Sequence, residues 1–129
     1  MMRRFSIISP LLLLFFVGCG KSDEAQMQET VIEVVKAQAV GDVERYLQYA
    51  DFGEELDSLH VCLLQSMLNR HKTVVDRKGG VADVVPKSST PENDSLAYMS
   101  YSVSYHDGTQ EQKIATLVRK DGCWKVSVK

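Results

Sequence analysis

The sequence predicts an α+β domain that follows a short apolar leader. Between residues 27 and 76, apolar side chains recur every three or four positions, which is the spacing of helices with one buried face. Between residues 81 and 128 the spacing becomes two, and Asp-Gly pairs at 107–108 and 121–122 mark tight turns. We therefore expect three N-terminal helices packed on an antiparallel sheet of about four strands.

The leader has the features of a secretory signal. Arg3 and Arg4 precede an apolar run from Phe5 to Val17. This run of 13 residues is shorter than the ~20 residues that a membrane-spanning helix needs. The pattern therefore favours an export signal over a permanent transmembrane helix.

The end of the leader, FVGC at residues 16–19, resembles the bacterial lipobox. The resemblance implies cleavage after residue 18 and a lipid on Cys19, which would hold the protein at a membrane of the cell envelope. Gly20, in place of an Asp, fits sorting to the periplasmic face of the outer membrane if the cell is Gram-negative. The alternative is an ordinary signal peptide in which Cys19 has no special role.

The expected mature chain is one small domain on a short tether. Removal of residues 1–18 leaves 111 of the 129 residues, too few for two domains. We assign residues 19–26 to the lipidated cysteine and its tether, and residues 27–129 to the domain. Loss of Arg3 and Arg4 moves the net charge from −2 to −4. A mildly acidic mixture of charges lacks the basic stripe of nucleic-acid-binding proteins, so we expect no nucleic-acid partner.

Three helices are expected. The first runs from residue 27 to about residue 40, where Gly41 ends it. Asp42 caps a second, shorter helix. The third starts at residues 51–54, where Asp and Glu have the spacing of a capping box, and ends near residue 76. Its buried stripe is expected to consist of Leu56, Leu59, Leu63, Met67 and Val74, flanked by Cys62, Leu64 and Leu68.

The strands follow the glycine pair at residues 79–80. Residues 81–85 form a first strand that Pro86 curtails or confines to a sheet edge, and residues 87–94 read as a loop. The next two strands are expected on either side of the turn at 107–108, and a last one at 123–128. Along the strand that starts near residue 97, one face is expected to carry Ala97, Met99, Tyr101, Val103 and Tyr105.

Two segments carry a family resemblance. They are VVKAQAVGDVERYL at residues 34–47, with its Gly-Asp helix junction, and TLVRKDGCWKV at residues 116–126, with its Asp-Gly-x-Trp-Lys hairpin. They resemble a family of secreted domains of unknown function, labelled lumazine-binding-like, within the nuclear-transport-factor-2-like superfamily. The resemblance covers most of residues 27–128. It implies a curved antiparallel sheet wrapped around helices in a cone whose mouth can hold a small molecule. Such cones serve as enzymes, binding proteins and interaction modules, so the fold alone does not settle the function.

The cysteines favour a covalent link. Once Cys19 carries lipid, Cys62 and Cys123 remain, and in an oxidising compartment an even remainder favours a disulfide between them. The alternative is two separate thiols, because Cys123 is out of phase with the apolar face of its strand.

Candidates for chemistry are few. Asp83, Tyr101 and Tyr105 are the residues that could place a carboxylate and phenols inside the cone mouth. Core packing of the two tyrosines and solvent exposure of Asp83 would explain the same pattern. His60 and His71 would lie about 16 Å apart along a helix, too far apart for one metal ion, so no metal or cofactor is expected.

These patterns predict a membrane-anchored lipoprotein whose domain binds a small ligand or a protein partner without catalysis. The alternative is a small isomerase- or hydrolase-like enzyme that uses the cone pocket. A third reading is a dimerising module that associates through the outer face of the sheet.

Overall fold

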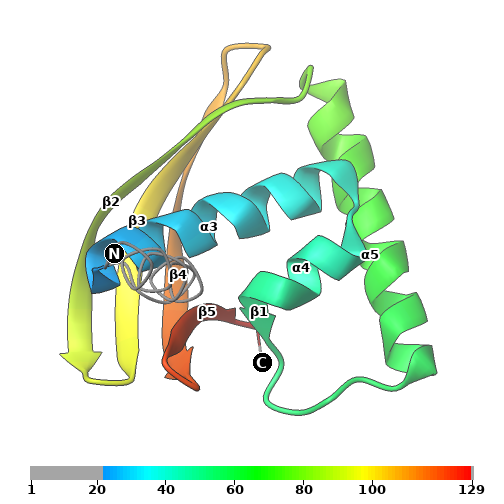
Figure 1. Ribbon diagram of the computed structural model, residues 1–129. Helices are drawn as coiled ribbons and strands as arrows, with labels where there is room; N and C mark the ends of the chain where they lie inside the picture. Colours follow the sequence, from blue (N-terminus) through cyan, green and yellow to red (C-terminus); the bar gives the residue numbers. More distant parts are fainter. Residues whose placement is uncertain (1–21, 129) are drawn as a thin grey trace, which may run out of the picture.

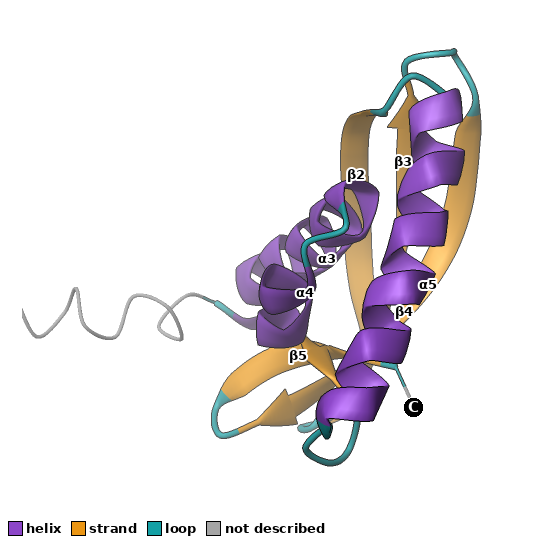
Figure 2. Ribbon diagram, turned by 90° about the vertical axis from the view of Figure 1, so that its right-hand side faces the viewer, coloured by secondary structure: helices purple, strands orange, loops and turns teal. Residues whose placement is uncertain are grey.

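Three helices lie against the inner face of a curved five-stranded sheet in the computed structural model, which describes residues 22–128 (Figures 1 and 2). The helices are α3 (Asp23–Val40), α4 (Val43–Tyr49) and α5 (Ser58–Arg77); the strands are β1 (Ala50–Asp51), β2 (Val81–Asn93), β3 (Leu96–Tyr105), β4 (Gln110–Lys120) and β5 (Cys123–Ser127). The expected α+β class and the three helices are confirmed. The leader, Cys19 and the lipobox lie outside the described residues.

Local sequence signals set the ends of the helices. The Ser22 side chain accepts a hydrogen bond from the Ala25 amide, so α3 begins four residues earlier than expected, at Asp23. Gly41 ends α3 in the left-handed conformation at φ 73°, which a glycine adopts without steric cost. Asp42 and Asp57 cap α4 and α5 in the same way as Ser22. The third helix therefore begins at Ser58, after a short strand that the sequence did not predict.

The orientation predicted for α5 is wrong. The residues that it buries are Leu64, Leu68 and Val75, whereas the expected stripe is exposed to solvent: Leu59, Leu63, Met67 and Val74. Helical spacing places the two apolar rows about a third of a turn apart on one helix. Periodicity detects both rows and cannot tell which one packs against the protein. In the structure the buried row packs mainly on α3, and α5 stands to the side of the sheet (Figure 1).

The sheet has the order β1-β5-β4-β3-β2. The four long strands are antiparallel as expected, but the two-residue β1 pairs parallel with β5, so the sheet is mixed. The expected loop at residues 87–94 is also wrong, because β2 continues through Pro86 and Pro91 to Asn93. The strand tolerates these prolines because it lies at the sheet edge and its pairing with β3 shifts register at both.

The core lies between α3 and the inner face of β3, β4 and β5. As expected, Ala97, Met99, Val103 and Tyr105 point inward from β3, and all four are buried. Polar bonds fix α3 on β5: the Gln26 side-chain oxygen accepts from the Trp124 amide at 2.7 Å, and the Thr30 hydroxyl donates to the Trp124 carbonyl at 3.2 Å. Because these groups are buried, the contacts set the position of α3 along the sheet.

The expected disulfide between Cys62 and Cys123 is not formed, because Cys62 is a free and exposed thiol. Cys62 belongs to the solvent-facing side of α5, beside the stripe whose orientation was mispredicted. Cys123 opens β5, on the far side of α3 and α4 from that surface (Figure 1).

Candidate functional site

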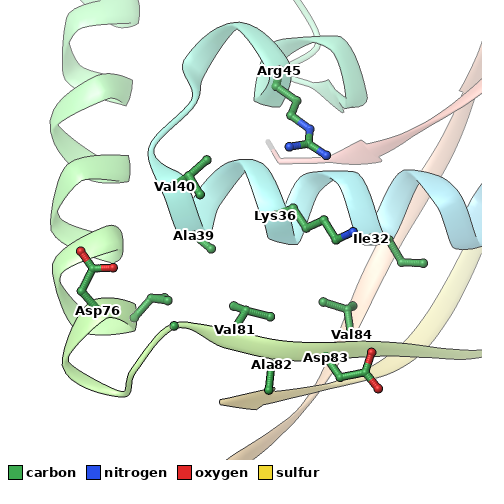
Figure 3. Close-up of a pocket in the computed structure, with 12 residues that line it drawn as sticks. Ile32, Lys36, Ala39, Val40, Arg45, Asp76, Val81, Ala82, Asp83 and Val84 are labelled. Atoms are coloured by element: carbon green, nitrogen blue, oxygen red, sulfur yellow. The ribbon is translucent and has the colours of Figure 1, made fainter. Parts of the chain in front are cut away.

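A cleft of about 500 Å³ opens between α3, the end of α5 and the first half of β2 (Figure 3). Its volume lies within the range of ~300–1,000 Å³ that is common for small-molecule sites. The apolar part of its wall comes from all three elements: Ile32, Ala39, Val40, Val75, Val81 and Val84. The site is therefore built from segments that are distant in the sequence.

The cleft exists because β2 is an edge strand that α3 crosses without covering completely. The two elements are joined near the start of α3, where the Glu24 carboxylate accepts hydrogen bonds from the Ser89 amide and from its hydroxyl at 2.5 Å. Toward the other end of α3 they separate, and Gly80 brings the chain from α5 into β2. The cleft occupies this separation.

The charged residues around the cleft are unequally compensated. Arg45 is held by Glu33, with 2.7 Å between Arg45 Nε and a Glu33 carboxylate oxygen, and Asp76 is held by Lys72 at 2.8 Å. Within residues 22–128, no ion pair engages Lys36, whose side chain lies along α3 above β2 (Figure 3). Lys36 is thus the cation of this wall that is available to a ligand.

The residues that the sequence grouped together do not share a site. Asp83 lines the cleft, yet it is exposed, and its carboxylate points away from α3 (Figure 3). It pairs across the sheet with Ser104, whereas Tyr101 and Tyr105 point to the opposite face with the buried Val103. Because side chains alternate along a strand, Asp83 and the tyrosines lie on opposite faces of the sheet.

The two tyrosines belong instead to a second polar group, the Tyr105 cluster, made of His71, Lys78, Tyr101, Tyr105, Glu111 and Lys113. The Tyr105 hydroxyl donates to the Glu111 carboxylate at 2.6 Å. The Lys78 ammonium lies 4.5 Å from the centre of the Tyr105 ring and 3.7 Å from a Glu111 oxygen. Lys113 also lies 3.7 Å from Glu111. The cluster thus joins the end of α5 to β3 and β4.

Burial and these contacts fix the protonation states in the cluster. Burial, together with the hydrogen bond to Glu111, raises the pKa of Tyr105 well above its usual value of 10.0, so its phenol stays neutral. The same hydrogen bond holds the pKa of Glu111 below 4.5. Burial, with the charge of Lys113, lowers the pKa of His71 below 6.5. At neutral pH the cluster therefore holds an ionised carboxylate and an uncharged imidazole.

Among residues 22–128, no group of three or more His, Cys, Asp or Glu side chains is placed to hold a metal ion. None of the helices in this part of the chain is long and apolar enough to cross a membrane.

A crystal structure from Campylobacter jejuni is similar to this chain. That protein carries the provisional name NTF2-like transpeptidase. It is 21% identical, the match covers 78% of this chain and 97% of that one, and the TM-score is 0.66. The fold is nuclear-transport-factor-2-like. No protein-family model matches the sequence, and neither does any curated protein. At this identity the similarity establishes the NTF2-like fold alone.

Sequence reasoning missed the main polar group of the cleft in this NTF2-like domain. Lys36 lies on the exposed side of α3, where a lysine is ordinary, and no spacing in the sequence marks it. The signal that could have pointed to the cleft is Val40, an apolar residue at the end of α3 that is 57% exposed. Val40 lines the cleft only because β2 lies opposite it, and β2 is distant in the sequence, so no local pattern predicts its position.

Proposed function

We propose that this protein is a lipid-anchored binding protein of the cell envelope, whose cleft between α3 and β2 takes a small ligand with an apolar body and one anionic group. The lipid on Cys19 would fix the protein at the membrane, and the domain would act without catalysis. The observation that carries the proposal is the combination of an open apolar cleft with one uncompensated cation, Lys36.

The two walls of the cleft suit such a ligand. Ile32 and Val84 face each other across the gap and would contact the apolar body (Figure 3). Burial of apolar surface gives about 25 cal/mol per Å², which makes this contact the main source of affinity. The Lys36 ammonium extends along the same gap and would pair with the anion, while Asp83 turns its carboxylate away. The charge near the gap therefore favours an acid over an amine.

The proposal can be tested with 1-anilinonaphthalene-8-sulfonate, a dye with an apolar body and one sulfonate. A soluble form that starts at residue 19 and carries Cys19→Ser should bind one dye, with a rise in fluorescence. Lys36→Glu should weaken binding about tenfold, since it replaces an attraction with a repulsion. Lys87→Glu, the same charge change on an exposed position of β2 outside the cleft, should leave binding unchanged. Equal effects of the two variants would contradict the assignment.

One observation favours a second candidate, a small isomerase-like enzyme. The Tyr105 cluster places an uncharged imidazole, His71, near a neutral phenol and an ionised carboxylate, which are groups that can exchange protons with a substrate. The C. jejuni protein is named for acyl transfer, but this cluster contains no Ser, Thr or Cys that could serve as the acyl acceptor. Proton transfer is therefore the reaction that the cluster would support.

The enzyme candidate predicts exchange of carbon-bound protons. The protein would be incubated with pyruvate in heavy water, and loss of the methyl proton signal would be followed by NMR. Exchange above the buffer rate that disappears in both His71→Asn and Tyr105→Phe would support it. Exchange at the buffer rate for the unmodified protein would count against proton transfer from this cluster and leave the binding proposal intact.

A further inference from the structure

The helix α5 presents an apolar row to solvent along most of its length. The row is defined here as the α5 stripe: Leu59, Leu63, Met67 and Val74, whose side chains are 65%, 54%, 56% and 47% exposed. It extends about 22 Å along the helix axis. Single exposed apolar residues are common, but an aligned row of four on one helix is typical of a contact surface.

The charges beside the stripe are arranged with opposite signs at its two ends. Just before the helix, Glu54, Glu55 and Asp57 are exposed, and of these three only Asp57 has a close partner in the described part of the chain, His60 at 2.7 Å. In its second half, Arg70 and Arg77 are exposed, and none of the ion pairs found within residues 22–128 engages either arginine. One end of the stripe is therefore acidic and the other basic.

This charge distribution is complementary to that of a second copy of the same helix. If a second α5 packed against the first in antiparallel orientation, the acidic end of each helix would face the basic end of the other. The two helix dipoles would also oppose each other favourably. A two-fold axis that passes near Met67, the midpoint of the stripe, produces both matches at once, as an isologous interface requires.

We propose that the α5 stripe is the self-association surface of this protein, on which α5 of a second copy packs in antiparallel orientation. The outer face of the sheet, where the sequence suggested a dimer interface, fits the role less well. Its exposed large hydrophobic residues are Val85, Tyr98 and Ile114, and each is paired across the sheet with a hydroxyl-bearing residue: Ser102, Thr116 and Ser100 respectively. The interface assigned here is separate from the α3–β2 cleft, to which α5 contributes only Val75 and Asp76, on a different side of the helix from the stripe.

Cysteine cross-linking of the full chain in the cells that produce it tests the geometry. In a Cys62→Ser background, Met67→Cys should yield a disulfide-linked dimer on oxidation, because a residue near the two-fold axis meets its own copy. Asn69→Cys is the matched control, since Asn69 lies at nearly the same height and is exposed, but on a different side of α5. Cys19 and Cys123 are present in both variants, so only the position of the new thiol differs. Dimer from neither variant, or equally from both, would overturn the proposal.

A charge-reversal experiment tests the orientation. Arg70→Glu with Arg77→Glu makes both ends of the stripe acidic, and Glu54→Lys with Glu55→Lys makes both ends basic. Each double variant alone should self-associate at least about tenfold more weakly in sedimentation velocity, because like charges then meet. A mixture of the two should recover the association, since each acidic end again faces a basic end. All four positions are exposed, so the thermal unfolding midpoint should not change when it is measured at protein concentrations too low for self-association.

Other occupants of the stripe would give a different pattern. If a membrane surface or an unrelated protein covered it, the purified unmodified chain would sediment as a monomer at every concentration, and the mixture of variants would recover nothing. Either result would overturn the assignment to a second copy.

Discussion

The surroundings of His71 lower the pKa of its imidazole. His71 belongs to the second half of α5, within electrostatic reach of the cations Lys78 and Lys113 and of the anion Glu111. Burial and the lysines disfavour the imidazolium, so the pKa of the folded state lies below the 6.5 of an ordinary histidine. The unfolded chain consequently binds a proton at this residue at a higher pH than the folded protein does.

This difference predicts a loss of stability in mild acid. As pH falls through 6.5 toward the lowered pKa of the folded state, protonation of His71 favours the unfolded chain, so the free energy of unfolding should decrease. His71→Gln should reduce that decrease between pH 7 and pH 5. Denaturant unfolding curves at several pH values measure the slope. An unchanged slope in the variant would show that other groups cause the loss.

The hydrogen bond between Tyr105 and Glu111 gives a second prediction for a single residue. Tyr105→Phe should lower the free energy of unfolding by about 1 kcal/mol, because the bond is lost while Glu111 keeps its two lysines and part of its contact with water. The pKa of Glu111 should rise in this variant, since its strongest stabilising contact has gone. Carboxyl ¹³C shifts as a function of pH would measure the change, and an unaltered titration would contradict it.

At the scale of the element, the question for α5 is which of its two apolar rows is buried. Leu68 is 4% exposed and Leu63 is 54% exposed. Leu68→Ala should therefore cost about 2–4 kcal/mol of stability, the range for a core leucine. Leu63→Ala should cost less than about 0.5 kcal/mol at protein concentrations too low for self-association. Chemical unfolding of the two variants measures both costs. If Leu63→Ala cost more stability than Leu68→Ala, the buried side of α5 would be the one predicted from the sequence.

The elements also show what sequence could and could not predict. The row of β3 was assigned correctly because this strand has one apolar face, as at Met99 and Val103. The helix α5 carries two apolar rows, and its packing on α3, which the sequence does not predict, determines which row is buried. The extent of β2 was missed because a proline usually ends a strand, and its tolerance here depends on the edge position of that strand.

At the scale of the whole molecule, the anchor and the cleft remain proposals with different origins in the sequence. The anchor rests on a contiguous motif, FVGC, which local reading detects. The cleft is lined by Lys36 and Val84, which come from distant segments of the chain, so no local sequence pattern predicts it.

The anchor predicts a specific effect of one cysteine. A clickable fatty acid fed to the producing cells should label the protein, and Cys19→Ser should abolish both the label and retention in the membrane fraction. Cys62→Ser is the control, because this thiol is free and exposed yet lies far from the proposed processing site in the sequence, and it should keep the label. A Cys19→Ser protein that is still labelled and still membrane-bound would contradict the anchor.

The location of the bound ligand tests the central claim most directly. An isotopically labelled soluble form that carries Cys19→Ser would be titrated with 1-anilinonaphthalene-8-sulfonate, and the amide signals would be followed by NMR. The largest changes should fall on Ile32, Ala39, Val40 and residues 81–84, which line the cleft between α3 and β2. Changes confined to Tyr101, Tyr105 and Glu111, or to the α5 stripe, would place binding elsewhere and contradict the account.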